Sequence, residues 1–426
     1  MSTPPKVTVV TTGSFPKVIV DTDPSFPKRQ KDSGGKSPKV IIATLGNFRK
    51  INLLDNLVGG VPAYYLIDFI NDTAVVANNS IGVLTSTPGW TYTRADAQTA
   101  YAENAAGVPI PFATGVPRIT DKGILIETTR TNLALRSRDF THAAWVKVNV
   151  TAGLTETGAD GTSNTASLIT ATAASGTILQ SLVAGSFSRA GSCYVKRVVG
   201  SGVIEFTIDN GATWTDITSS LSTGAFFRAS KVATITNPVI GFRITTSGDA
   251  IAVDFAQLEQ SSVTSPIPTV DTSAVRAIDI LTFTVAGVTY PATIFSEFSR
   301  PVIGTSAEHY GSMNFDNNDR LSMNIQNTNV PRCLVRVGGA TITNIDMPGT
   351  AITGVNKIAM RANTDDFQGA VNGTLGTPTL TGVVPVAPVI FEVGSQAAAN
   401  LANNFIRRVA IFNYALNDAE LQAITT

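Results

Sequence analysis

The regular spacing of turn residues after Trp145 most constrains the fold of this chain. Short segments that alternate apolar and polar residues, such as residues 191–196 and 203–209, are separated by turns such as Asp209-Asn210-Gly211. Strands that recur about every 8–12 residues between such turns are typical of β-sandwiches and jelly rolls. Alternation places one side of each strand against a core and the other in water. The sequence therefore predicts an all-β protein.

Composition excludes several classes of function. Charged residues make up 15% of the 426 residues and the formal net charge is zero, so the broad basic surface of a nucleic-acid-binding protein is missing. No run of 18 apolar residues is present, which argues against a membrane span. A chain of this length can bury more than one core, and its low charge content suits a protein that buries surface in an assembly.

The Ser/Pro/Thr-rich stretch at residues 261–271 marks the best internal boundary. We expect an extended N-terminal segment, a small separate β unit, a junction, a first β-sandwich, a linker and a second β-sandwich. In chain order these parts are residues 1–40, 41–85, 86–130, 131–262, 263–282 and 283–426.

Residues 1–40 are rich in Pro, Ser, Thr and Lys, and the tetrapeptide SFPK occurs twice, at residues 14–17 and 25–28. Proline fixes φ and lacks an amide donor, so we expect extended backbone, including residues 18–20. Such a segment is too polar to fold alone. It is predicted to anchor the chain on an acidic partner surface, a disordered leader being the alternative. The predicted anchoring residues are Phe15, Pro16, Phe26, Pro27, Lys28 and Arg29.

Residues that carry chemistry are sparse. His142 and His309 lie far apart, outside any metal-ligand spacing, and are expected in ordinary surface or boundary positions. Cys193 and Cys333 lie in alternating segments and are predicted to be buried free thiols, a long-range disulfide being the alternative. The oxygen-rich loop at residues 314–319 is predicted to be a solvated turn, with a Ca²⁺ site as the alternative.

Carboxylates were the remaining candidates for catalysis, because a glycosidase needs two carboxyl groups at short distance. We expect Glu127 to pair with an arginine of the junction and Asp365-Asp366 to lie in a turn. We therefore expect no catalytic residue, no cofactor and no metal ion. The other carboxylates considered are Glu205, Asp209, Asp254, Glu259 and Glu297.

Three stretches resemble a module of bacteriophage fibre, spike and decoration proteins, in which similar stretches bracket a carbohydrate-binding-like β-sandwich. The resemblance covers residues 86–282, and it implies a virion surface protein without indicating a ligand. The matching residues are Arg94, Tyr101, Gly123, Ile126, Glu127, Arg130, Thr131, Asn132, Leu133, Trp145, Arg276, Ala277 and Asp279.

The C-terminal part resembles concanavalin A/laminin-G-like sandwiches. These end in a strand followed by a short helix, as expected for residues 404–421, where Asn417 can cap the helix and Glu420 lies at the capping-box position. Residues 367–373, FQGAVNG, resemble a hairpin of the same group. This resemblance covers residues 283–426 and bears on the fold rather than on the function.

Together the resemblances imply a bacteriophage structural protein, either a tail or head fibre or a capsid decoration protein. The implied partners are other virion proteins bound through the N-terminal segment, sister chains of a homotrimer and a host cell-surface glycan. The N-terminus lacks the features of a secretory signal, so we expect synthesis in the host cytoplasm, release by lysis and a place on the virion surface. A carbohydrate-active enzyme or a free lectin is the alternative.

Glycan-binding sandwiches commonly stack a sugar ring on an aromatic residue that is flanked by polar groups. Trp214 follows the Asp209-Asn210-Gly211 turn and is the best candidate, with a core position as its alternative. Tyr194, Asp209 and Asn210 complete the predicted glycan site. Trp145 matches the phage motif and is expected in the core.

Overall fold

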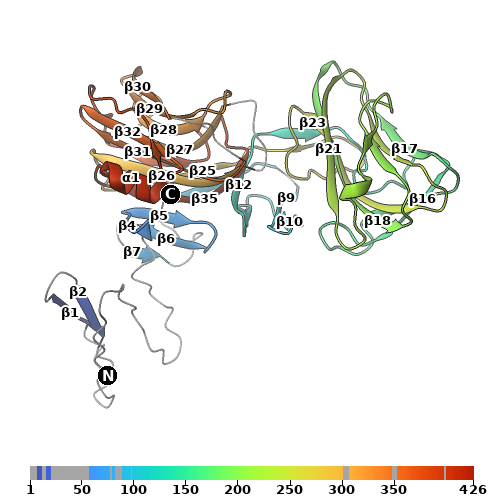
Figure 1. Cartoon of the computed structure of the whole chain (residues 1–426), viewed down its shortest axis with the longest axis horizontal. Helices are drawn as coiled ribbons and strands as arrows, with labels where there is room; N and C mark the ends of the chain where they lie inside the picture. The colour runs from blue at the N-terminus through green and yellow to red at the C-terminus, as the bar shows by residue number, and fades with distance from the viewer. Residues whose placement is uncertain are drawn as a thin grey trace, which may run out of the picture. The chain divides into compact units, whose positions relative to one another are not determined.

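The computed structural model describes residues 7–11, 16–20, 57–76, 79–81, 89–96, 98–300, 307–347, 353–397 and 400–426. The chain forms two compact units, Met1–Asn52 and Leu53–Thr426, and the described part consists mainly of β-strands (Figure 1). This confirms the predicted all-β class.

In the first unit, β1 (Val7–Thr11) and β2 (Pro16–Val20) form an antiparallel pair. The expected extended backbone of residues 18–20 is therefore present, as part of β2. Of the predicted anchoring residues, only Pro16 is described, and it is the first residue of β2. The other five, Phe15, Phe26, Pro27, Lys28 and Arg29, lie outside the described residues.

One sandwich is formed by a single continuous stretch of chain, residues 133–260, and consists of two five-stranded sheets. We call it the inserted sandwich, because in the sequence it lies between the two parts of the other sandwich. A short 3-10 helix, η2 (Thr218–Ser220), follows β20. The first sheet has the order β14 (Val146–Val148), β17 (Gly176–Ser181), β22 (Val239–Ile244), β19 (Ile204–Thr207) and β20 (Thr215–Asp216). The second has the order β15 (Val150–Glu156), β16 (Ala166–Ala171), β23 (Ala250–Gln260), β18 (Phe187–Val199) and β21 (Phe227–Ile235).

Alternate residues of these strands fill one core between the two sheets. Trp145 is buried in it and stacks on Phe140 with ring centroids 3.9 Å apart, which confirms the expected core position. Cys193 belongs to this core, whereas Cys333 belongs to another, and both are free thiols. Burial raises the pKa of each thiol, so the prediction of buried free cysteines is confirmed.

The other sandwich is formed by two separate parts of the sequence, residues 57–126 and residues 280–426. We call it the split sandwich. Its ten-stranded sheet runs β33 (Thr374–Leu375), β32 (Asp366–Val371), β31 (Gly354–Asn363), β26 (Ala292–Arg300), β35 (Asn404–Phe412), β5 (Tyr65–Asp68), β6 (Thr73–Val76) and β7 (Asn79–Ile81), with β12 (Gly123–Ile126) and β11 (Ile119–Thr120) attached at β35. Its seven-stranded sheet runs β30 (Ala340–Asp346), β29 (Pro331–Val337), β28 (Arg320–Ile325), β27 (Glu308–Asn314), β34 (Ile390–Val393), β25 (Ile280–Thr284) and β8 (Trp90–Thr93).

The split arrangement differs from the expected separate β unit at residues 41–85 and from a purely connecting role for residues 86–130. Strand β5 pairs with β35, as the adjacent blue and red strands of Figure 1 show, and β8 pairs with β25. Tyr65, Ile67 and Phe69 are buried in the same core as Ile294 and Ile411. The early strands therefore complete a core that the C-terminal residues leave open.

A third layer covers the outer side of the ten-stranded sheet. It consists of helix α1 (Asp418–Thr425) and the hairpin of β3 (Leu57–Val58) and β4 (Val61–Pro62). Leu421 and Ile424 of α1 pack with Val58 and Phe295 in a separate hydrophobic cluster. The Asn417 side chain accepts a hydrogen bond from the Glu420 amide, and the Glu420 side chain accepts one from the Asn417 amide, which confirms the predicted capping box.

Two further strand pairs connect the parts of the second unit. Strand β13 (Arg130–Asn132) pairs with β24 (Ala274–Arg276), so the chain enters and leaves the inserted sandwich through adjacent antiparallel strands. Strands β9 (Ala100–Glu103) and β10 (Pro109–Phe112) form a hairpin. Among the described residues, no helix has the length and apolar character needed to cross a membrane.

Gly123, a residue of the phage-like motif, is required where β12 meets β35. Its φ is +114°, and an added Cβ would lie 2.2 Å from the Ile406 carbonyl oxygen. Gly107 has a φ of +77° but open space around its Cα. We expect Gly123→Ala to lower the free energy of unfolding by about 1–3 kcal/mol more than Gly107→Ala does. Urea denaturation of both variants tests this, and equal losses would contradict the steric role of Gly123.

Candidate binding site

The phage-like motif residues converge on a buried ion-pair network rather than on a ligand site. Arg118 donates from Nη1 to Glu127 Oε2 at 2.7 Å and from Nη2 to Asp279 Oδ2. Glu127 also lies 3.1 Å from Arg276 Nη1, and Asp279 Oδ1 lies 3.9 Å from Arg94. We call Arg94, Arg118, Glu127, Arg276 and Asp279 the junction network, and all five are buried. The predicted pairing of Glu127 with a junction arginine is confirmed.

Mutual charge compensation keeps this network ionised. Burial alone would raise the pKa of Glu127, but Arg276 and Arg118 lower it to about 2. Burial disfavours the charged form of Arg118, yet Asp279 and Glu127 raise the pKa of its guanidinium. Because every charge faces an opposite charge, the network joins the strands that flank the inserted sandwich. Its unpartnered polar atoms among the described residues are the buried Nε atoms of Arg118 and Arg276.

Tyr194 of the predicted glycan site cannot stack on a sugar. It is 1% exposed, its hydroxyl donates to Glu103 Oε1, and its ring packs near Phe255 and under the guanidinium of Arg228. Its position on β18 points its side chain to the β9–β10 hairpin, which covers it. Alternation in the sequence predicted strand β18, but it did not predict that the β9–β10 hairpin covers Tyr194.

Trp214 is partly exposed on the outer side of the first sheet of the inserted sandwich. The Arg243 guanidinium lies 4.6 Å from its ring centroid and forms an ion pair with Glu205. An added Cβ on Gly211 would lie 2.7 Å from the same ring. Trp214 thus belongs to a compact surface cluster in which neighbouring groups already contact its ring.

Asp209 and Asn210 build the turn that precedes Trp214. Asp209 accepts hydrogen bonds from the Thr207 hydroxyl and from the amide of Thr213. Burial opposes its charge, but the bonds from Thr213 and Thr207 lower its pKa to about 2. Asn210 is exposed with a φ of +60°. The structure brings three of the four predicted residues together, with Asp209 committed to the turn.

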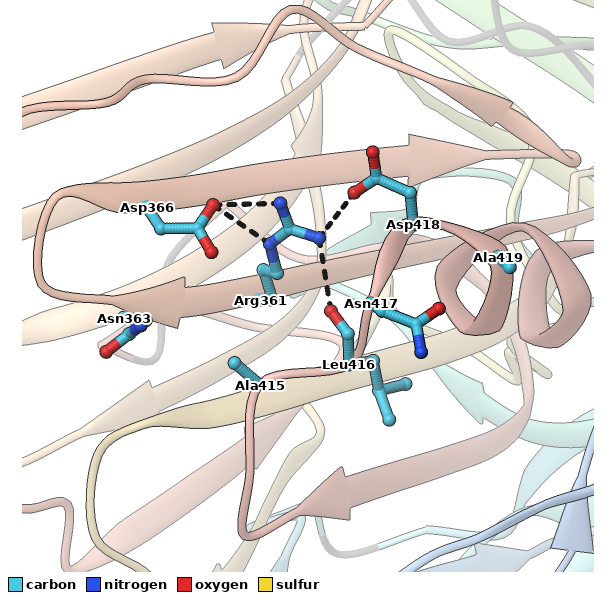
Figure 2. A pocket seen from close by; sticks show the side chains of 8 residues that line it. All are labelled: Arg361, Asn363, Asp366, Ala415, Leu416, Asn417, Asp418 and Ala419. Atoms are coloured by element: carbon cyan, nitrogen blue, oxygen red, sulfur yellow. Dashed lines mark hydrogen bonds and ion pairs between the residues drawn. The ribbon is translucent and has the colours of Figure 1, made fainter.

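A pocket with a volume of about 620 Å³ lies beside the N-terminus of α1. Figure 2 shows the Arg361 guanidinium between the carboxylates of Asp366 and Asp418. Its Nε and Nη2 donate to Asp366, and its Nη1 donates to Asp418 and to the Leu416 carbonyl. The helix amides are capped by Asn417. These interactions fasten α1 to β31 and β32.

A different surface has the character of a binding site. On the seven-stranded sheet, Leu321 and Met323 of β28 face the core, so the alternating residues Arg320, Ser322 and Asn324 face outward. By the same alternation and by the strand register, residues of neighbouring strands lie on this side, including the apolar Leu334 opposite Ser322 and Arg332 opposite Asn324. We call seven of the polar residues on this side the polar face: Ser312, Asn314, Arg320, Ser322, Asn324, Arg336 and Glu392.

Hydrogen bonds order part of this face. The Asn314 amide donates to Glu392 Oε1 at 2.7 Å, and the Ser395 hydroxyl donates to Glu392 Oε2 at 3.3 Å. Ser312 Oγ donates to Asn314 Oδ1. Phe315, the residue after Asn314, is 47% exposed at the edge of the face. Ser312, Asn314, Glu392 and Ser395 thus form an ordered hydrogen-bonded group at the end of β27.

Other polar atoms of the same face lack partners. Ser322 Oγ, Arg320 Nε and Arg336 Nε are buried and have no hydrogen-bond partner in the described part of the chain. The same is true of Nδ1 of His309, which lies opposite Asn324. Buried polar groups are normally hydrogen-bonded. Unpartnered atoms also occur elsewhere in the described residues, as at Nε of Arg118 and Arg276, but four of them gather on this one face.

The environment of His309 differs from the expected surface or boundary position. The residue is 6% exposed, and burial, assisted by Arg320, lowers its pKa to about 4. The expectation was wrong because a sequence does not reveal which residues of adjacent strands cover a side chain. His142 is half-buried in its loop, where its Nδ1 accepts a hydrogen bond from the Ala144 amide.

The carboxylates considered for catalysis are occupied by structural partners. Arginines bind Glu127, Glu205, Asp254, Glu297 and Asp366, while Glu259, Asp209 and Asp365 accept hydrogen bonds from nearby backbone amides. In the 314–319 loop, Asp316 accepts from the amides of Asn318 and Asp319. The described residues contain no cluster of three or more metal-ligating side chains.

Sequence reasoning missed the polar face. The alternation in Arg320-Leu321-Ser322-Met323-Asn324-Ile325 is visible in the sequence, but its polar positions read as ordinary solvent-facing residues. The signal that could have indicated this face is the oxygen-rich loop at residues 314–319, because it directly precedes β28, the strand that carries Arg320, Ser322 and Asn324.

The chain matches no protein-family model and no curated protein. It is distantly similar in structure to the carbohydrate-binding module CBM40 of a Ruminococcus gnavus IT-sialidase bound to α2,3-sialyllactose, with 19% identity, a TM-score of 0.27, and coverage of 32% of this chain and 82% of that chain. It is also similar to a heptameric SAP-like pentraxin from Limulus polyphemus, with 12% identity, a TM-score of 0.25 and coverage of 33% and 73%. The NanB sialidase from Streptococcus pneumoniae matches with 12% identity, a TM-score of 0.28 and coverage of 33% and 26%. TM-scores this low describe a distant likeness and carry no information about the ligand of this chain.

Proposed function

We propose that this chain is a non-enzymatic attachment protein of a bacteriophage particle, and that its split sandwich binds a host-surface glycan through the polar face. The observation that carries the proposal is the group of buried, unpartnered polar atoms beside the ordered Asn314–Glu392 pair. The phage setting rests on the resemblance of the motif at residues 86–282, and the absence of a catalytic role is supported by the structural partners of the carboxylates considered.

In this proposal, different residues of the polar face make different contacts with the bound sugar. Glu392 is half-buried and accepts hydrogen bonds from sugar hydroxyls, while Asn314 supplies a further polar group beside it. Phe315 provides an apolar surface for the ring. Hydroxyl-rich ligands suit such a set because each lost hydrogen bond to water is replaced by one to the protein.

A comparison of two variants tests which sandwich binds. Glu392→Ala is expected to weaken glycan binding by about 10-fold or more, since it removes the central acceptor and frees Asn314 and Ser395. Trp214→Ala is expected to leave binding unchanged. Binding of the full chain and both variants is measured on a glycan array and on host cells. Loss with Trp214→Ala alone would move the site to the inserted sandwich.

The virion part of the proposal has its own test. Deletion of residues 1–40 is expected to abolish incorporation of the chain into particles while the second unit remains folded. Incorporation is measured by immunoblotting of purified particles, and circular dichroism of the truncated chain reports its folding. Normal incorporation of the truncated chain would contradict the anchoring role of this segment.

A further inference from the structure

Two neighbouring arginines on the polar face lack acidic partners. Arg320 and Arg336 lie opposite each other in the β28–β29 register. Neither has a carboxylate oxygen within 4.0 Å among the described residues. The other arginines of the split sandwich that the structure describes each form an ion pair: Arg94, Arg118, Arg300, Arg332, Arg361, Arg407 and Arg408.

The arrangement of these two arginines leaves donors free. Arg320 Nη1 donates to the Asn317 carbonyl and Arg336 Nη2 to the Gly339 carbonyl, so the two adjoining turns hold the guanidinium groups in place. The Nε atoms remain buried without partners, as does Ser322 Oγ two residues along the same strand. Burial and the proximity of Arg336 lower the pKa of Arg320, as expected for two like charges that share a poorly solvated site.

An anionic ligand group would neutralise the unpaired positive charge of Arg320 and Arg336. Arginine pairs well with planar or tetrahedral oxyanions because its N–H groups match two oxygens at once. The one acidic member of the polar face, Glu392, is engaged by Asn314 and Ser395. Its charge partly offsets that of Arg320, but it forms no ion pair with either arginine. The guanidinium groups of Arg320 and Arg336, which lie side by side without a carboxylate partner, are therefore suited to a ligand that brings its own negative charge.

We infer that the polar face selects acidic glycans and holds a carboxylate or sulfate group of the sugar between Arg320 and Arg336. This inference rests on the proposed glycan attachment and adds the chemical class of the ligand. The uncharged hydroxyls of the same sugar would contact Glu392 and Asn314 beside the anion.

The experiment uses the full chain on an array that carries oligogalacturonate, its neutral methyl ester, a sulfated galactan and its desulfated form. We expect binding to one or both charged forms and at least about 10-fold weaker binding to their neutral counterparts. Oligogalacturonate and the sulfated galactan distinguish a carboxylate from a sulfate. Arg336→Gln is expected to remove this preference. Arg336→Lys, which keeps the charge but not the paired donors, is expected to retain part of it.

Arg332→Gln is the matched control, because Arg332 lies on the same strand and the same side of the sheet as Arg336 but is paired with Asp346. Its binding is expected to remain within about twofold of the wild type, and thermal unfolding verifies that each variant is folded. Equal binding of charged and neutral forms, or an acidic preference that survives Arg336→Gln, would overturn the inference while leaving glycan attachment intact. A blank array would instead contradict the proposed function itself.

Discussion

Replacement of Arg118 with Met is expected to lower the free energy of unfolding by about 3–5 kcal/mol. The substitution removes the positive charge that lies between Glu127 and Asp279, all of them buried. Arg276 still contacts Glu127, but Asp279 is left with Arg94 at 3.9 Å as its nearest cation. Asp279 keeps hydrogen bonds from the Tyr92 hydroxyl and the Glu127 amide. A buried carboxylate without a close cation is nevertheless costly, which makes this one of the largest expected single-site effects in the chain.

Urea denaturation of the full chain, followed by tryptophan fluorescence and circular dichroism, measures this effect. Arg332→Met is the control, since Arg332 pairs with Asp346, whose side chain is 50% exposed, and exposed pairs contribute less than about 1 kcal/mol. If both variants lost the same small amount of stability, the junction network would not be the structural centre that its burial indicates.

Acidification is expected to destabilise the second unit through His309. In the unfolded chain this histidine titrates near its ordinary pKa of 6.5, whereas burial lowers its pKa in the folded chain to about 4. Between these two values the unfolded chain binds a proton that the folded chain rejects, so stability falls as the pH drops from 6.5 to 4. The full loss from this group amounts to about 3 kcal/mol.

The comparison that isolates this contribution uses His309→Asn, which cannot be protonated in this range. The free energy of unfolding of the variant is expected to fall less steeply between pH 6.5 and 4 than that of the wild type. Carboxylates titrate similarly in both proteins and cancel in the difference. Parallel pH profiles would show that His309 is not the group whose protonation the fold resists.

Local features of the fold were predictable from the sequence because they depend on neighbouring residues. The alternation at residues 191–196 and 203–209 corresponds to β18 and β19, and the cap at Asn417 follows from residues within one helical turn. The pairing of β5 with β35 was not predictable, since 340 or more residues separate the partners and any apolar strand of similar length would satisfy the same alternation.

The predicted glycan site and the polar face show the same difference between local and long-range features. Trp214, Asp209 and Asn210 lie together because one turn connects them, as local patterns indicated. The polar face instead combines β27, β28, β29 and β34, whose register is set by long-range pairing. Arg320 and Arg336 become neighbours only in that register, so a sequence alone gives no reason to connect them.

The adjacent strands β13 and β24 place the two ends of the inserted sandwich at the spacing of one β-ladder, about 5 Å. A foreign domain whose own termini lie side by side could therefore replace residues 133–273 without distorting the split sandwich. The molecule thus has the layout of a scaffold that carries a separately folded module between two neighbouring strands.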